Sequence, residues 1–244
     1  MMKRILSALV IIPIVLFTLF YQDTIFFHIL LVACGVALSI EILFLANYKV
    51  DYYMVILTAV SVAALIFYKK YNFFNFDFYN FLILITAIDL FGAGFFYTFD
   101  RNFDRCLMNT SLSVFALITS GIFISIFYEI RVSYPLGKFY ILYLFSVVWL
   151  YDAGGYFFGK NYGKIKLGLA VSPNKSWAGL AGGLLLSLAG TFLMFLVIDK
   201  LFLSEQGMLS KDPLFSNKIR LVIITILIAL IAQMGDLFES VMKR

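Results

Sequence analysis

Long apolar stretches recur along the whole chain and constrain its fold more than any other feature. A helix that crosses a bilayer needs about 20 mostly apolar residues, and eight stretches approach that length. They are Ile5–Phe20, Thr24–Ala46, Tyr52–Tyr68, Phe78–Phe99, Leu107–Tyr128, Phe139–Phe158, Trp177–Ile198 and Ile219–Met234. The pattern predicts an all-α, polytopic integral membrane protein with about eight transmembrane helices.

Composition supports this prediction and excludes other classes. Of the 244 residues, 63% are hydrophobic and 14% are charged, whereas a soluble domain carries about 25% charged residues. The net charge of +5 fits Lys- and Arg-containing cytoplasmic loops better than nucleic-acid binding, so we expect no nucleic-acid partner. The two cysteines have neither zinc-site nor disulfide-framework spacing.

The distribution of positive charge predicts the orientation. If the N-terminus is cytoplasmic, eleven Lys and Arg residues fall on inner segments and eight on outer ones, the direction that the positive-inside rule favours. We therefore expect a multi-pass protein of the inner (cytoplasmic) membrane. Helices 1 to 5 would occupy residues 1–138. Helices 6 to 8 would occupy 139–244, with a cytoplasmic loop at 159–176 on the same side as the C-terminal polar stretch.

The sixth predicted span carries an acid and leads into a glycine- and lysine-rich loop. Asp152 lies near its cytoplasmic end, and an acid inside a membrane is unfavourable unless it is paired, metal-bound or hydrated. Lys160 and Lys164 follow in the loop. They could bind a substrate phosphate, or they could contact anionic lipid headgroups as an ordinary cytoplasmic loop does.

The next polar segment, SPNKSWAG at 172–179, predicts the start of a helix. Ser172 would be the N-cap and Pro173 the first helical residue. The N–H groups of a helix start favour an anion, and a phosphate there would explain Lys175 in the first turn. Gly179 and Gly183 form a GxxxG step that predicts close helix packing and would also suit a homodimer.

The C-terminal polar stretch places two acids one helical turn apart. Asp236, Glu239, Ser240 and Lys243 would share one helix face. Two such carboxylates can hold Mg²⁺ and leave coordination positions for phosphates. The alternative is an ordinary amphipathic helix end with a Glu–Lys pair. Deep in the fourth span, Asp89 is either a functional acid or a helix-packing partner.

Several motifs together resemble one enzyme family. They are DAGGYFFGK at 152–160, KL at 166–167, SPNKSWAG at 172–179, GG at 182–183 and GDLFESVMKR at 235–244. In this order they are similar to CDP-diacylglycerol synthase, also called phosphatidate cytidylyltransferase. The resemblance covers roughly the last hundred residues, and the first 140 match only as apolar spans.

The resemblance implies a Mg²⁺-dependent reaction of CTP with phosphatidic acid in a cavity open to the cytosol, with membrane lipids around the protein. It implies a metal site at Asp236, supported by Glu239, and catalytic roles for Asp236, Lys175 and Lys243. The substrate-binding residues that it implies are Asp152, Lys160, Lys164, Ser172, Ser176, Ser240 and Arg244.

The family signature continues beyond the Lys-Arg pair with further acidic residues, whereas the sequence stops at Arg244. We therefore expect a chain cut within its active site, with little or no turnover by itself. Two other functions stay open. One is a transporter or lipid-binding protein without chemistry, and the other is a dolichol-kinase-like, CTP-dependent lipid kinase.

Overall fold

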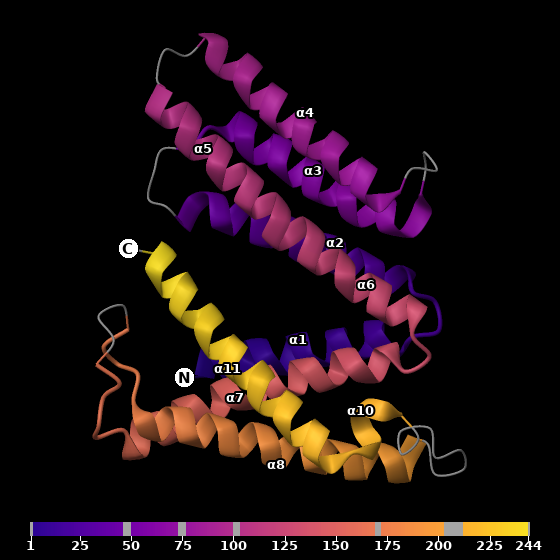
Figure 1. Ribbon diagram of the computed structural model, residues 1–244, viewed down its shortest axis with the longest axis vertical. Helices are drawn as coiled ribbons and strands as arrows, with labels where there is room; N and C mark the ends of the chain where they lie inside the picture. The colour runs from indigo at the N-terminus through magenta and orange to yellow at the C-terminus, as the bar shows by residue number, and fades with distance from the viewer. Residues whose placement is uncertain are drawn as a thin grey trace. The chain divides into compact units, whose positions relative to one another are not determined.

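A computed structural model describes residues 2–45, 50–72, 77–99, 103–168, 172–202 and 212–243. Within these residues the chain is almost entirely helical (Figure 1). The elements are α1 (Met2–Phe20), α2 (Ile25–Leu45), α3 (Tyr52–Tyr71), α4 (Phe78–Phe99), α5 (Phe103–Ala116), the π-helix η1 (Leu117–Ile122), α6 (Phe123–Ser133), α7 (Gly137–Tyr162), α8 (Trp177–Phe202), α10 (Pro213–Ser216) and α11 (Lys218–Met242).

Seven helical segments of the described chain are long and apolar enough to cross a membrane. They are Ile25–Phe44, Tyr52–Tyr71, Phe78–Thr98, Cys106–Ser133, Gly137–Tyr162, Trp177–Val197 and Lys218–Met242. The predicted all-α, polytopic membrane protein is thus confirmed. The first expected span forms a helix, of which Val10–Phe20 counts as a shorter apolar segment, so its crossing stays a prediction.

The chain forms two compact units, Met1–Lys138 and Phe139–Arg244. In the first unit, α2 to α5 run beside one another as long antiparallel neighbours (Figure 1). The span Cys106–Ser133 consists of α5, η1 and α6 in succession. Leu65, Tyr68, Phe81 and neighbouring apolar side chains form a core between its helices.

Hydroxyl groups surround the one deeply buried acid described in this unit, Asp89, which is 1% exposed on α4. Its carboxylate accepts hydrogen bonds from Ser61 of α3 at 2.6 Å and Ser113 of α5 at 2.9 Å. Thr58 in turn shares a 2.7 Å hydrogen bond with Ser113. Because these bonds join three helices, they favour the helix-packing interpretation of Asp89 over the functional one.

Glycines bring α7 and α8 of the second unit into close contact. A Cβ atom on Gly154 of α7 would lie 2.5 Å from the main-chain oxygen of Gly182 on α8. A Cβ atom on Gly183 would lie 2.8 Å from the Tyr151 ring. The predicted close packing at Gly179 and Gly183 is therefore confirmed. Since the partner is α7 of the same chain, these glycines give no support to a homodimer.

Candidate functional site

The described parts of the segment that joins α7 to α8, residues 163–168 and 172–176, pair with each other, and we call this pair of stretches the hairpin. Lys166 and Ser176 form an antiparallel β-bridge. The Leu167 N–H donates to the Lys175 main-chain oxygen at 2.9 Å, and the Trp177 N–H donates to the Ile165 oxygen at 3.1 Å. This pairing fixes Lys175 and Ser176 against the end of α7.

The predicted helix start at Ser172 is wrong, because α8 begins at Trp177. The Lys175 N–H donates to the Ser172 oxygen at 3.2 Å, which makes 172–175 a turn with Pro173 second. That position suits the fixed φ of proline as well as a first helical position does. Ser176 caps the helix instead, since its Oγ accepts a 3.2 Å hydrogen bond from the Gly179 N–H. Lys175 therefore precedes the helix.

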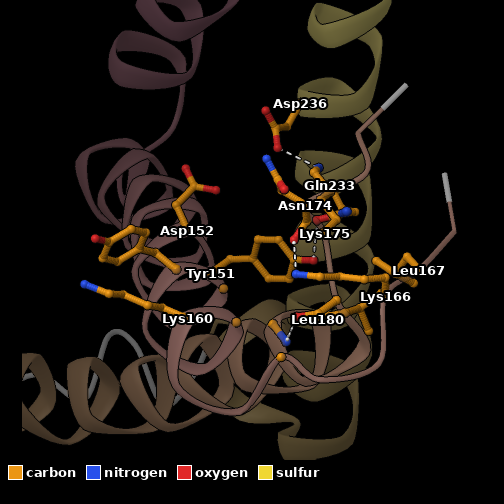
Figure 2. Close-up of a pocket in the computed structure, with 16 residues that line it drawn as sticks. Tyr151, Asp152, Lys160, Lys166, Leu167, Asn174, Lys175, Leu180, Gln233 and Asp236 are labelled. Carbon is orange, nitrogen blue, oxygen red and sulfur yellow. Dashed lines mark hydrogen bonds and ion pairs between the residues drawn. The ribbon is translucent and has the colours of Figure 1, made fainter. Parts of the chain in front are cut away.

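A cavity of about 540 Å³ lies between α7, the hairpin, α8 and α11 (Figure 2). Gly155, Gly159 and Gly179 line part of it, and the absence of side chains there leaves room beside the two helices. The polar side chains that line it come from all of these elements except α8. They include Asp152, Lys160, Lys166, Asn174, Lys175, Gln233 and Asp236.

Charges of both signs face this cavity. The Lys175 Nζ lies 2.6 Å from Asp236 Oδ2, which joins the hairpin to α11. The Lys175 side chain is 17% exposed, and that of Asp236 is 57% exposed. Figure 2 shows Asp152 on α7 and Asp236 on α11, and both residues line the cavity. Two carboxylates and several ammonium groups can together receive a metal–phosphate ligand.

Comparison with known proteins identifies the family. The sequence model of the cytidylyltransferase family matches residues 2–244. The chain belongs to this cytidylyltransferase family. The resemblance predicted from the motifs is thereby confirmed at the level of the family.

Three bacterial proteins are similar in sequence to part of this cytidylyltransferase-family chain. The phosphatidate cytidylyltransferases of Staphylococcus aureus (strain COL) and Staphylococcus saprophyticus are each 36% identical over 138 residues. That of Staphylococcus epidermidis is 35% identical over 137 residues. Each match covers 56% of this chain and 46% of the relative. The chain thus spans about half the length of the curated relatives it matches.

The structure brings some of the predicted site residues to the cavity and leaves others away from it. Those that line it are Asp152, Lys160, Lys175, Ser176 and Asp236. Among the described residues, those predicted for the site but not lining this cavity are Lys164, Ser172, Glu239, Ser240 and Lys243. Arg244 lies outside the described residues.

The C-terminal helix face forms as predicted, but most of its polar groups bond to one another. Lys243 forms an ion pair with Glu239, which is the amphipathic alternative retained from the sequence. The Ser240 hydroxyl donates to the main-chain oxygen of Asp236 at 2.8 Å. The structure therefore separates Asp236, which faces the cavity, from Glu239, although the two lie one turn apart.

Several cavity residues were not predicted for the site from the sequence, and Gln233 and Tyr151 are two of them. Gln233 lies one turn before Asp236 on α11, and its Oε1 accepts a 2.7 Å hydrogen bond from the Tyr151 hydroxyl of α7. Tyr151 is buried. A signal for Gln233 existed, because it is a polar residue in an otherwise apolar run three positions before an acid. Tyr151 carried no such signal among the chain's 15 tyrosines.

The donor set of the cavity suits a hard divalent cation. Mg²⁺ prefers oxygen ligands and is commonly held by one or two carboxylates together with substrate phosphates. Asp152 and Asp236 supply two carboxylates to one cavity. Among the described residues, no group of three or more His, Cys, Asp and Glu side chains is placed to hold a metal by itself. A metal here would therefore depend on ligands from the substrate.

Proposed function

We propose that the cavity binds CTP and phosphatidic acid in a phosphatidate cytidylyltransferase of phospholipid biosynthesis. The observation that carries this proposal is the convergence of Asp152, Asp236 and Lys175 on one cavity of a cytidylyltransferase-family chain. The curated relatives bear the same activity in their names. The apolar helices that surround the cavity would let a lipid substrate reach it from the bilayer.

The proposed reaction transfers CMP to the lipid. A phosphate oxygen of phosphatidic acid attacks the α-phosphorus of CTP, the bond from that phosphorus to the bridging oxygen of the β-phosphate breaks, and pyrophosphate leaves. The nucleophile is already an anion near neutral pH, so the chain needs no strong base. The contribution of the protein is positioning and positive charge, for which Lys160, Lys166 and Lys175 line the cavity.

Asp236 would hold Mg²⁺ together with Asp152. When bound, the ion would neutralise charge on the phosphates and polarise the reacting phosphoryl group. We do not pair Asp236 with Glu239 for this role, because Glu239 bonds to Lys243. The contributions of Lys164, Ser172, Ser240, Lys243 and Arg244 stay predictions from the resemblance. The proposal also keeps the inner membrane as the location, with the N-terminus and the cavity on the cytoplasmic side.

Ligand binding is the first test, because it reports on the cavity without depending on turnover. Equilibrium dialysis of the detergent-solubilised protein with labelled CTP and Mg²⁺ should show saturable binding that EDTA removes. Asp236→Asn should abolish the Mg²⁺-dependent part. Binding that is neither saturable nor metal-dependent would contradict the proposal.

The fate of the label separates the related functions. With CTP labelled in the α-phosphate, cytidylyl transfer places the label in the lipid product, CDP-diacylglycerol. A dolichol-kinase-like enzyme transfers only a γ-phosphate label to its lipid. A transporter or lipid-binding protein transfers neither label, so binding without any transfer would favour that function.

A further inference from the structure

The ion pair between Lys175 and Asp236 occupies the carboxylate proposed to hold the metal. The Lys175 Nζ is buried, and its carboxylate partner lies at 2.6 Å. The hairpin turn at Ser172 and the bridge at Ser176 fix the main chain on both sides of this lysine. The fold therefore fixes the main chain of Lys175, and the ammonium group of this lysine is buried beside Asp236.

This arrangement opposes binding of a free divalent cation. While the ammonium group contacts Asp236 Oδ2, the carboxylate is neutralised and one of its oxygens is engaged. A cation that displaced Lys175 would leave a buried positive charge without a partner and close to a second positive charge, which is strongly unfavourable. Free metal therefore competes with the protein's own lysine.

A phosphate changes this balance, because it offers Lys175 a replacement partner. Phosphate oxygens form strong, charge-assisted hydrogen bonds with ammonium groups. Once Lys175 contacts a phosphate, Asp236 is free to bind the metal that the same phosphate chain carries. Lys160 and Lys166 line the same cavity, so they add to its affinity for polyphosphate.

We propose that Lys175 makes the site selective for a metal–polyphosphate complex and excludes the free metal. Lys175 exchanges Asp236 for a phosphate, and Asp236 exchanges Lys175 for the cation. The inference rests on the proposed function, since it takes Asp236 as a metal ligand. Because coupling between two ligands is reciprocal, metal should strengthen polyphosphate binding by the factor by which polyphosphate strengthens metal binding.

The test measures Mn²⁺ binding by electron paramagnetic resonance of the free ion, without nucleotide or lipid. Lys175→Gln removes the positive charge and should bind free Mn²⁺ at least about 5-fold more tightly than the wild type, the lower end of typical coupling factors. The same variant should bind the Mn²⁺–pyrophosphate complex more weakly. Lys175→Arg keeps the charge and should resemble the wild type in both measurements.

Opposite shifts for free and complexed metal distinguish this exchange from a structural role, which would weaken both. Equal or weaker binding of free Mn²⁺ by Lys175→Gln, including no detectable binding in either protein, overturns the inference. If Lys175→Gln does not fold, as judged by thermal unfolding in detergent, Lys175→Met replaces it with a side chain of similar length.

Asp236→Asn separates failure of this inference from failure of the proposed function. If Asp236→Asn binds the Mn²⁺–pyrophosphate complex as the wild type does, the metal assignment itself is wrong. If Asp236→Asn loses this complex but Lys175→Gln gains no affinity for free Mn²⁺, only the exchange is wrong.

Discussion

The two units of this membrane protein each place an acid among apolar helices, but in different surroundings. In the first unit, Asp89 is 1% exposed and accepts hydrogen bonds from neutral hydroxyl groups. In the second unit, Asp236 faces a cavity, is 57% exposed and pairs with a lysine. An acid on one helix that accepts hydrogen bonds from hydroxyl groups of two others holds the three helices together. An acid beside a cavity and an exchangeable cation can bind a ligand.

The contacts between helices also differ between the two units. Hydroxyl groups of Thr58, Ser61 and Ser113 join α3 to its neighbours in the first unit. In the second unit, Gly154 and Gly182 bring the main chains of α7 and α8 together. Glycines elsewhere on the same helices line the cavity. The glycines of α7 and α8 thus leave room for a ligand beside the helix contact. The side chains of the hydroxyl cluster, in contrast, bond to one another between their helices.

Neutralising the acid of the cavity should have the largest effect on ligand binding. Asp236→Asn should weaken Mg²⁺-dependent CTP binding by about 100-fold or more, because metal neutralisation of phosphate charge is worth several kcal/mol. Glu239→Gln, one turn away, should change it by less than about 3-fold, since exposed ion pairs contribute about 1 kcal/mol or less. Equilibrium dialysis measures both. Equal losses would place Glu239 back in the metal site.

The glycine contact between α7 and α8 should be less tolerant than a glycine in the first unit. Gly154→Ala should destabilise the protein by about 1–3 kcal/mol, because its Cβ meets main-chain atoms that cannot turn aside. Gly94→Ala on α4 has no neighbouring atom within 4 Å, so it should be neutral or slightly stabilising through helix propensity. Thermal unfolding in detergent compares the two. Similar melting temperatures would argue against the close contact.

Replacing the acid of the first unit should affect stability and leave ligand binding intact. Asp89→Leu removes the acceptor of two buried hydroxyl groups and should lower the free energy of unfolding by about 1–3 kcal/mol. Asp89→Asn keeps an acceptor oxygen and should cost less. Thermal unfolding and CTP dialysis are measured on both variants. A well-folded Asp89→Asn protein that no longer binds CTP would make Asp89 a functional acid.

The smallest expected effect separates two lysines four residues apart. Both side chains are exposed, but Lys160 lines the cavity and Lys164 does not. Lys160→Gln should weaken CTP binding by about 2- to 5-fold, the effect of one partly screened charge. Lys164→Gln should weaken it by less than about 2-fold. Titrations at low and high salt measure both variants. Equal, salt-sensitive losses would mean that the loop attracts phosphate through its overall charge.

The sequence by itself determined the class of the fold and the region of the site. Apolar stretches of bilayer length dictate helices, because a helix satisfies its own backbone groups. The motifs at 152–160, 172–179 and 235–244 resemble those of one family closely enough to indicate where the cavity lies. Glycine spacing predicted a close helix contact, since small side chains are needed wherever main chains approach.

Only the tertiary structure decided which groups meet. Helical spacing placed Asp236 and Glu239 on one face, but the hairpin holds Lys175 over the first and leaves the second to Lys243. The Ser172-Pro173 pair fits a turn and a helix start equally well, and the bridge between Lys166 and Ser176 selected the turn. Gln233 of α11 belongs to the site because it lines the cavity and accepts a hydrogen bond from Tyr151 of α7. Contacts between segments far apart in sequence depend on packing, and no local pattern encodes them.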